Sequence, residues 1–183
     1  MREISISKAI QRISKPAKLA LVVSNPPVGG KGPTIITLEW FMRTSTDPAM
    51  FAISIGLTRY SYELLSENRK FVLAIPSTEM AEQTLKCGTI SGRNCNKIVE
   101  FNIHTKKGKL SDIPLLADAV ANFECQTVTQ VRTGDHTIFV GEAKYAWIHE
   151  DVTLQPLLSV PPNDPNYEIL AGNERYNLGR IKS

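Results

Sequence analysis

Residues Phe51 to Pro76 read FAISIGLTRYSYELLSENRKFVLAIP, and they carry the pattern of two strands joined by a turn and a short helix. Phe51 to Gly56 is a compact apolar run, which is typical of a buried strand. Tyr60 and Leu64 then recur at helical spacing, and Phe71 to Ile75 is a second β-rich run. The stretch therefore predicts a strand, a polar turn, a short helix and a second strand in succession.

The turn of this unit is rich in polar groups. Thr58-Arg59-Tyr60-Ser61 offers hydroxyls, a guanidinium and the free amides of a helix N-terminus. Together these groups can bind an anion such as a phosphate. An ordinary cluster of capping residues on a solvated turn has the same composition. The turn alone leaves both interpretations open.

Length, composition and charge indicate a single cytoplasmic domain over residues 1–183. Hydrophobic residues make up 42% of the sequence and charged residues 21%, as in ordinary globular proteins. The N-terminal residues lack the apolar centre of a signal peptide, and no apolar run is long enough to span a bilayer. A formal net charge of +3 with dispersed basic residues suits a small anionic ligand and does not favour a nucleic-acid or membrane partner.

The cysteines and histidines give little support for a disulfide framework or a metal site. No two cysteines form a CxxC pair, and an odd number without an export signal favours reduced thiols. The histidines lie far apart and form no HExxH-like motif, so we predict no metal centre. The residues concerned are Cys87, Cys95, Cys125, His104, His136 and His149.

The two ends of the chain are predicted to be a helix and an extended segment. Ile6, Ile10 and Ile13 place an apolar stripe on one face of a helix within residues 1–16. This stripe could dock on the domain or on a second subunit. Residues 150–183 contain several prolines and few periodic runs, which predicts an extended C-terminal segment.

Two β-rich runs and a turn-rich loop precede the central unit. Leu19 to Ser24 and Thr34 to Ser45 are predicted to pair as a hairpin. Residues 25–33 between them are rich in proline and glycine, but their Gly-Lys pair is followed by glycine, which excludes a P-loop. Trp40 and Phe41 could line a planar ligand or belong to the core.

A helix and a small polar segment are predicted after the central unit. Ser77 and Thr78 can cap a helix that Gly88 is well placed to end. Cys87 to Lys97 reads CGTISGRNCNK, with serine, arginine and lysine around two glycines. This composition fits a surface loop, and it also fits an anion site because glycines let backbone amides approach a ligand closely.

Two further strands complete the predicted fold. Phe123 to Val131 and Phe139 to Trp147 are β-rich, with a turn from Thr133 to His136, and residues of the second strand alternate between its two faces. The total of roughly six strands and two or three short helices favours a mainly β fold, a β-barrel with peripheral helices. Strands and helices do not alternate and GxGxxG is absent, which excludes a doubly wound sheet.

Seven segments, in order, resemble the flavin reductase-like family of FMN-binding split barrels, in particular its flavoredoxin-like branch. They are TIITLEWF, TSTDPAMFAISIG, RYSYELLSENRKFVLAIP, CGTISGRNCNKIVEF, FECQ, TGDHTIFVGEA and AGNERYNLG. The resemblance implies a Greek-key-like split barrel that forms a homodimer and binds FMN near the subunit interface. It also implies that the bound FMN accepts a hydride from NAD(P)H. The electrons would then pass to free flavin, a metal complex or a redox protein.

The resemblance also implies which residues form the cofactor site. Thr34 to Trp40 resembles the strand beside the isoalloxazine ring, and Ser54 to Leu57 resembles the segment along the other part of the flavin. The turn from Arg59 to Ser61 and the loop with Ser91, Gly92, Arg93 and Lys97 match the parts of the family site that meet the phosphate. The implied cofactor-binding residues are Thr34, Ile35, Ile36, Thr37, Leu38, Trp40, Ser54, Ile55, Gly56, Leu57, Arg59, Tyr60, Ser61, Cys87, Gly88, Ser91, Gly92, Arg93 and Lys97.

The resemblance assigns two further residues to the substrate side of the site. His136 is expected near the reactive face of the flavin and the incoming nicotinamide, as the candidate catalytic residue. Tyr176 and Gly179 match a C-terminal segment that often closes over such sites.

The charges of the phosphate-facing residues fit the implied cofactor. The phosphate of FMN carries roughly −1.5 to −2 at neutral pH, and Arg59, Arg93 and Lys97 could neutralise it. Two positions depart from the family pattern: relatives commonly have Asn at the position of Thr34 and Asp at the position of Asn96. The second departure removes a charge that would orient the lysine or arginine of the loop.

Three functions fit these observations to different degrees. The first is an NAD(P)H-dependent flavin reductase, and the second is a non-enzymatic FMN protein that carries electrons to a docked redox partner. A barrel that binds single-stranded nucleic acid is disfavoured, because it needs a basic groove with interleaved aromatics and only 7% of residues are aromatic. The sequence offers no catalytic triad, which fits hydride chemistry supplied by a flavin.

Overall fold

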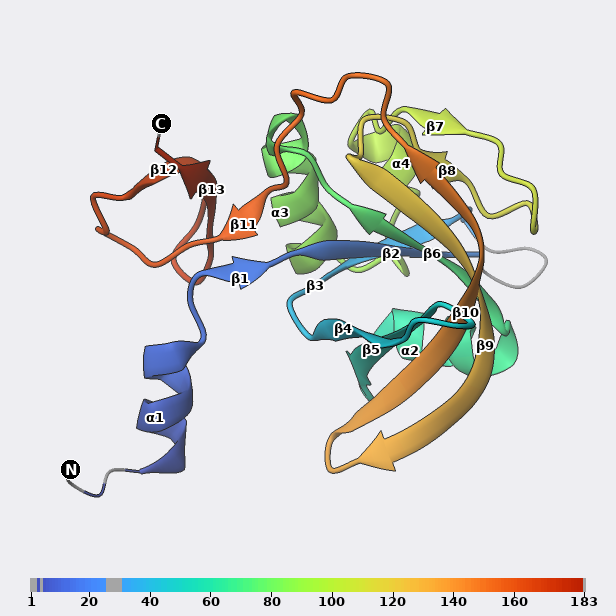
Figure 1. Ribbon diagram of the computed structural model, residues 1–183, viewed down its shortest axis with the longest axis horizontal. Coiled ribbons are helices and arrows are strands. Elements are labelled where there is room, and N and C mark those ends of the chain that lie inside the picture. Colours follow the sequence, from blue (N-terminus) through green and yellow to red (C-terminus); the bar gives the residue numbers. More distant parts are fainter. Residues whose placement is uncertain (1–2, 4, 26–30, 183) are drawn as a thin grey trace.

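The computed structural model describes residues 3, 5–25 and 31–182, and its main feature is a strongly curved sheet of seven strands (Figure 1). Neighbouring strands are antiparallel throughout, in the order β3-β2-β6-β9-β10-β5-β4. The strands are β2 (Ala20–Ser24), β3 (Thr34–Leu38), β4 (Phe41–Ser45), β5 (Met50–Gly56), β6 (Lys70–Ile75), β9 (Ala121–Thr133) and β10 (His136–Ile148). The predicted loop at 25–33 lies mostly outside the described residues. The mainly β, barrel-like fold class is confirmed.

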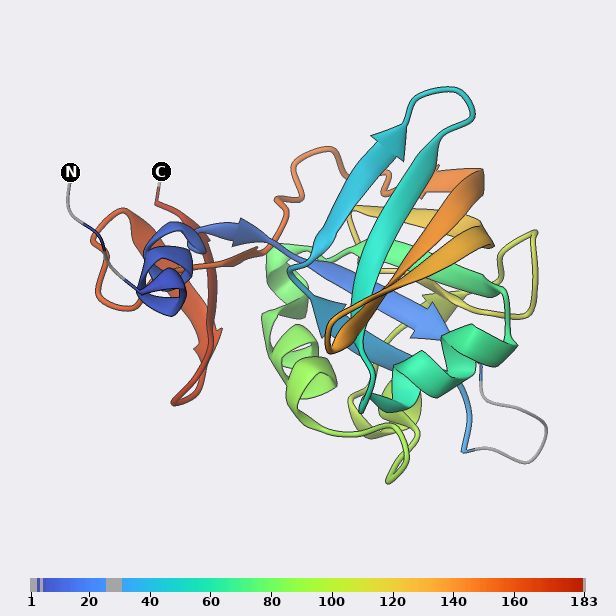
Figure 2. The ribbon, with the colours of Figure 1, turned by 90° about the horizontal axis from the view of Figure 1, so that it is seen from below.

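A smaller sheet lies beside the barrel and joins the two ends of the chain (Figures 1 and 2). Its strand order is β1-β11-β13-β12. A separate two-stranded sheet, β7–β8, lies next to strand β6 of the barrel. The bounds are β1 (Ala17–Lys18), β11 (Leu158–Ser159), β12 (Tyr167–Gly172), β13 (Asn177–Ile181), β7 (Thr105–Lys106) and β8 (Leu115–Leu116). Part of the segment expected to be merely extended, residues 150–183, therefore forms three strands.

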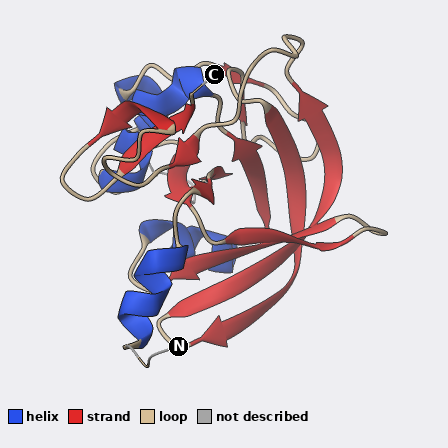
Figure 3. Cartoon of the chain, turned by 60° about the vertical axis from the view of Figure 1, so that its left-hand side comes forward, coloured by secondary structure: helices blue, strands red, loops and turns tan. Residues whose placement is uncertain are grey.

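Short helices surround the sheets (Figure 3), and α2, α3 and α4 contribute residues to the cavity described below. Helix α3 packs against β3 of the barrel and against β12 and β13 of the smaller sheet, so it lies between the two sheets. The helices are α1 (Ile6–Ile13), α2 (Tyr60–Glu67), a 3-10 turn (Thr78–Met80), α3 (Ala81–Thr89) and α4 (Lys97–Glu100). None of the helices in the described ranges has the length and apolar character needed to cross a bilayer.

The core lies on both faces of the seven-stranded sheet. Leu21 and Val23 of β2 pack in one buried cluster, whereas Ala20 and Val22 pack in a second cluster on the opposite face. Successive strand residues point to opposite faces, so β2 is covered on both sides and reads as a continuous apolar run. A third cluster joins Leu19, α3 and the smaller sheet.

The central unit and the N-terminal helix form as the sequence predicts. Strand β5, helix α2 and strand β6 follow one another within the predicted stretch. Helix α1 ends at Ile13, before Pro16. Its stripe does not pack on the rest of the described chain, because Ile6, Ile10 and Ile13 are 79%, 55% and 80% exposed.

Two local predictions are wrong. The run from Thr34 to Ser45 is not one strand: β3 pairs with β2 as expected, but the chain turns at Glu39 and β4 pairs with β5 instead. Gly88 does not end its helix, because α3 continues to Thr89. Gly88 instead allows α3 to approach β3, since a Cβ there would lie 3.2 Å from Cβ of Thr37.

Strand β9 carries a buried thiol that should make stability depend on pH. Burial raises the pKa of Cys125 from 9.0 to about 12. Between these values the unfolded chain releases this proton and the folded chain keeps it, so the free energy of unfolding falls as pH rises. When the pH rises from 8 to 10.5, we expect the free energy of unfolding of Cys125→Ala to fall by about 1–2 kcal/mol less than that of the wild type. Urea unfolding at three pH values measures this difference, and equal losses in both proteins would contradict it.

Candidate functional site

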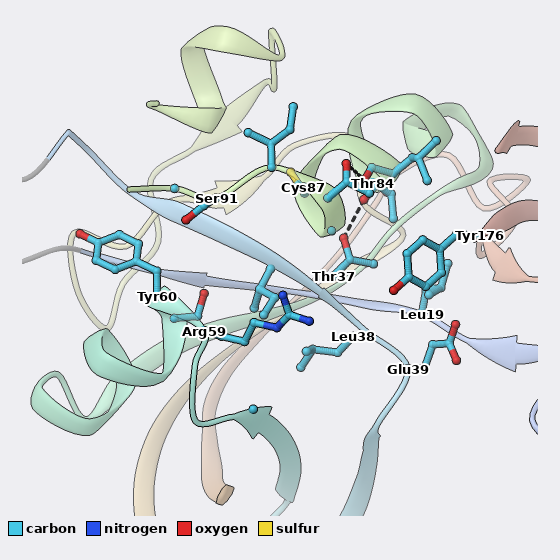
Figure 4. A pocket seen from close by; sticks show the side chains of 18 of the residues that line it. Leu19, Thr37, Leu38, Glu39, Arg59, Tyr60, Thr84, Cys87, Ser91 and Tyr176 are labelled. Atoms are coloured by element: carbon cyan, nitrogen blue, oxygen red, sulfur yellow. Dashed lines mark hydrogen bonds between the residues drawn. The ribbon is translucent and has the colours of Figure 1, made fainter. Parts of the chain in front are cut away.

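A cavity of about 620 Å³ lies between the barrel, α3 and the smaller sheet, and Figure 4 shows part of its lining. Its walls come from β3 and the turn after it, the end of β5 and start of α2, helix α3 with the loop that leads to α4, the start of β10, and the β12–β13 hairpin. Cavities of this size hold cofactors and drug-sized ligands. The site is therefore assembled from segments far apart in the sequence.

Arg59 brings a free guanidinium into the cavity at the start of α2. Its backbone is fixed because Arg59 N donates to Gly56 O at 3.0 Å and Tyr62 N donates to Arg59 O at 3.0 Å. Its side chain extends toward the middle of the cavity (Figure 4) and forms no ion pair or hydrogen bond with any described residue. A guanidinium and the first amides of α2 together form a favourable environment for an anion.

The loop after α3 closes the same end of the cavity. Gly92 is pressed against Thr34, since a Cβ at this glycine would lie 1.9 Å from Oγ1 of Thr34. The guanidinium of Arg93 pairs with the carboxylate of Glu63 and lies 4.7 Å from the ring centroid of Tyr60. Arg93 is thus oriented by a carboxylate and an aromatic ring of helix α2.

Lys97 is buried, and its ammonium connects two walls of the cavity. The side chain is 3% exposed, and Nζ donates to the backbone oxygens of Ile35 at 2.6 Å and Cys87 at 2.7 Å. Burial lowers the pKa of Lys97 below its usual value of 10.5. The preceding Asn96 caps α4, since its Oδ1 accepts from the amides of Ile98 and Val99. Asn96 carries no charge that could orient Lys97. The backbone carbonyl oxygens of Ile35 and Cys87 orient the lysine instead.

His136 and Trp40 form the aromatic part of the cavity wall. Nδ1 of His136 lies 2.7 Å from Oδ1 of Asp135, and this hydrogen bond lowers the pKa of Asp135. Nδ1 donates to the carboxylate, which leaves Nε2 on the side of Gly56. The ring centroids of His136 and Trp40 are 4.8 Å apart. The chain thus presents an oriented imidazole beside an aromatic ring.

The β12–β13 hairpin forms the opposite wall. Oδ1 of Asn173 accepts from the amides of Arg175 and Tyr176, both at 2.9 Å, and Asn173 N donates to Tyr176 O. Leu178 and Ala171 of the hairpin strands pack in the cluster that includes α3. Tyr176 points into the cavity from this wall (Figure 4).

Most of the residues assigned from the sequence lie in this one cavity. His136, Tyr176 and all but three of the implied cofactor-binding residues line it. The exceptions are Ile35, Ile55 and Leu57. Ile35 and Ile55 are fully buried in the core because they alternate with cavity-facing neighbours along their strands. Leu57 contributes its amide to Asp135 O.

Ten lining residues are not among those assigned individually from the sequence, although Thr58 belongs to the polar turn predicted to bind an anion. Several stand directly beside assigned residues or within the matching segments, and two on α3 precede Gly88 by a helical turn, a spacing that could have indicated them. Lys15 and Leu19 offered no local signal. The ten are Lys15, Leu19, Glu39, Thr58, Thr84, Leu85, Thr89, Ile90, Arg175 and Leu178.

The described part of the chain contains no group of three or more His, Cys, Asp or Glu side chains placed to hold a metal ion. Its cysteines are free thiols, with Cys87 and Cys125 buried and Cys95 partly exposed. Burial raises the pKa of Cys87 to about 12, so the thiol at the cavity wall is protonated at neutral pH.

Comparisons with known proteins agree with this architecture. A family model described as flavin reductase like domain matches residues 13–162. An uncharacterized protein of Archaeoglobus fulgidus is 35% identical over 127 residues, which are 69% of this chain and 70% of that protein. An NADH-dependent FMN reductase of Streptomyces nodosus is 27% identical over 112 residues, 61% of this chain and 60% of the relative. The flavoredoxin structure from Methanosarcina acetivorans superposes with a TM-score of 0.76 at 24% identity, over 88% of each chain.

Proposed function

The chain belongs to the flavin reductase-like family, and on this premise we propose that it is an NAD(P)H-dependent flavin reductase with FMN in the cavity. Hydride would pass from NADH or NADPH to the bound FMN, and electrons would then pass to free flavin or another acceptor. We further propose that it works in the cytoplasm as a homodimer with FMN near the subunit interface. A bound flavin supplies the hydride chemistry.

The observation that carries this proposal is the guanidinium of Arg59, which has no counter-ion among the described residues and projects into a cavity of cofactor size. Arg59 directly precedes helix α2, and Ser61 and Ser91 line the same cavity. A phosphate carrying roughly two negative charges would be neutralised there by charge-assisted hydrogen bonds. The donor set thus fits the phosphate end of FMN.

The rest of the lining fits a flat ring system. Ile36 and Leu38 of β3 give an apolar surface, and Thr37 keeps its side chain ordered by donating to Thr84 O at 2.7 Å. Thr84 Oγ1 is itself buried at this wall without a hydrogen-bond partner in the described chain. Trp40 and His136 stand at the edge. The residues of β3 would bind and orient the ring, and exclude water from it.

A second candidate function is an FMN-containing electron carrier that docks a redox protein. Its support is an exposed apolar pair near the cavity: Trp40 is 60% exposed and Met42 is 61% exposed. Such exposed apolar side chains, two residues apart in the sequence, would be covered by a docked protein. The same pair would serve the interface of the proposed homodimer.

An absorption spectrum with anaerobic titration separates these functions. The purified protein is saturated with FMN, and NADH or NADPH is then added. Prompt bleaching of the flavin bands is expected for a reductase and identifies its donor. Bands that persist with both donors would favour the electron carrier. Failure to bind FMN at all would overturn the proposal.

His136 is expected to act on hydride transfer and not on cofactor retention. We expect His136→Ala to bind FMN as tightly as the wild type but to be reduced by nicotinamide about tenfold more slowly, because the donor loses a positioning contact. Anaerobic stopped-flow spectroscopy measures the rate. His149→Ala, which changes a histidine away from the cavity lining, is the matched control. A wild-type rate in His136→Ala would remove His136 from the site.

A further inference from the structure

The cavity contains positive charge that the protein itself does not neutralise. Arginine and lysine side chains line it at five positions, and three of these make strong contacts: Lys15 with Glu39 and Ser159, Arg93 with Glu63, and Lys97 with two backbone oxygens. The remaining two, Arg59 and Arg175, have no carboxylate partner in residues 3, 5–25 and 31–182. The proposed FMN phosphate accounts for Arg59 and leaves Arg175 unexplained.

Arg175 comes from the loop of the β12–β13 hairpin, which is a different wall of the cavity from the turn that carries Arg59. Figure 4 shows Tyr60 and Ser91 on one side of the cavity and Tyr176, the neighbour of Arg175, on the other. Apolar side chains such as Leu19 and Leu38 also line the cavity. The cavity therefore receives a guanidinium without a carboxylate partner from each of two separate walls.

The backbone at Arg175 is held in place, whereas its guanidinium is free. The side chain of Asn173 accepts from Arg175 N, which fixes the turn. The adjoining strands are anchored by Leu178 in the cluster with α3. The nearby carboxylate of Glu39 is paired with Lys15, so it repels an incoming anion less than a free carboxylate would.

We propose that Arg175 binds a phosphate group of a second ligand, the reduced nicotinamide dinucleotide that donates hydride; this assignment rests on the proposed function. A planar guanidinium with several N–H donors can bind two phosphate oxygens at once. With Arg59 engaged by the flavin phosphate, Arg175 selects a donor that itself carries phosphate. A dinucleotide flavin reaching both guanidinium groups would present the same chemistry.

Donors with and without phosphate test the assignment directly. FMN-loaded wild type, Arg175→Gln and Arg180→Gln are reduced anaerobically with NADH, with NADPH and with the uncharged donor 1-benzyl-1,4-dihydronicotinamide. Arg180→Gln is the matched control, because Arg180 lies in the same sheet, pairs with Glu168 and does not line the cavity. Affinities for FMN and FAD are measured in parallel by fluorescence titration.

The expected result is selective for the charged donors. Arg175→Gln should raise the half-saturating concentration of NADH or NADPH about tenfold, the loss of one charge-assisted contact. It should leave reduction by the uncharged donor unchanged, and Arg180→Gln should behave as the wild type. Unchanged NADH saturation in Arg175→Gln, or an equal loss with the uncharged donor, would overturn the proposal. A loss confined to FAD affinity would also overturn it, since the phosphate would then belong to the flavin.

Failure of the proposed function can be distinguished from failure of this assignment. If no nicotinamide donor reduces the wild type, the reductase function is wrong. Calorimetric titration of the same proteins with inorganic pyrophosphate then decides the role of Arg175. Binding about tenfold weaker in Arg175→Gln than in Arg180→Gln supports a phosphate site, and equal binding overturns it.

Discussion

Lys97→Met is expected to lower the free energy of unfolding by about 2–4 kcal/mol. Methionine keeps the length and apolar stem of the side chain, but the carbonyls of Ile35 and Cys87 lose their only described side-chain donor. Each buried acceptor left unpaired costs about 1–3 kcal/mol. Removing a desolvated charge offsets part of this cost.

Urea unfolding of both proteins without flavin measures the effect of Lys97→Met. Lys31→Met is the matched control, because Lys31 also donates to a backbone oxygen, that of Asn94 at 2.9 Å, but at an exposed position. We expect the control to change stability by less than about 0.5 kcal/mol. A fully stable Lys97→Met that binds FMN much more weakly would instead assign Lys97 to the phosphate, as the sequence resemblance implies.

Arg59→Ala is expected to weaken FMN binding about 10- to 100-fold, with little change in stability. The guanidinium makes no ion pair with the described residues, so removing it breaks no internal contact. Loss of a charge-assisted hydrogen bond to phosphate costs about 1–3 kcal/mol, and each 1.4 kcal/mol is tenfold in affinity.

Fluorescence titration at low and high salt gives the affinities for the Arg59 prediction. The difference between wild type and Arg59→Ala should shrink at high salt, because mobile ions screen the charge. Arg12→Ala, on the exposed helix α1, changes the net charge equally and should bind FMN as the wild type does. An unchanged affinity in Arg59→Ala would place the phosphate elsewhere.

Local periodicity was enough to predict the central unit, because its apolar runs and helical spacing can be read from residues close in sequence, even though β5 pairs with the distant β10 and β6 pairs with β2 and β9. The environment of Lys97 was not predictable in this way. Its two oxygen acceptors are 62 and 10 residues away, and only the folded chain brings them together. Lys97, which the sequence resemblance assigns to the phosphate site, is thus a buried connection between β3 and α3 in the structure.

The smaller sheet was missed for a related reason. Strand β1 pairs with β11 through Ala17 and Ser159, more than 140 residues apart. Strands of two residues leave almost no periodic signal. Without that sheet the hairpin carrying Arg175 could not be placed against the cavity, although the residue lies within a matching segment.

The β12–β13 hairpin stands outside the barrel, and this position divides the binding site into two parts that can change independently. Substitutions in the flavin half disturb strands such as β3 that also hold the core together. Substitutions at the tip of the hairpin, between Asn173 and Tyr176, would alter the proposed contact with the second ligand while the barrel stays intact. On the proposed assignment of Arg175, exchanging this short peptide between relatives would change the preference for an electron donor and leave the proposed flavin-binding residues unchanged.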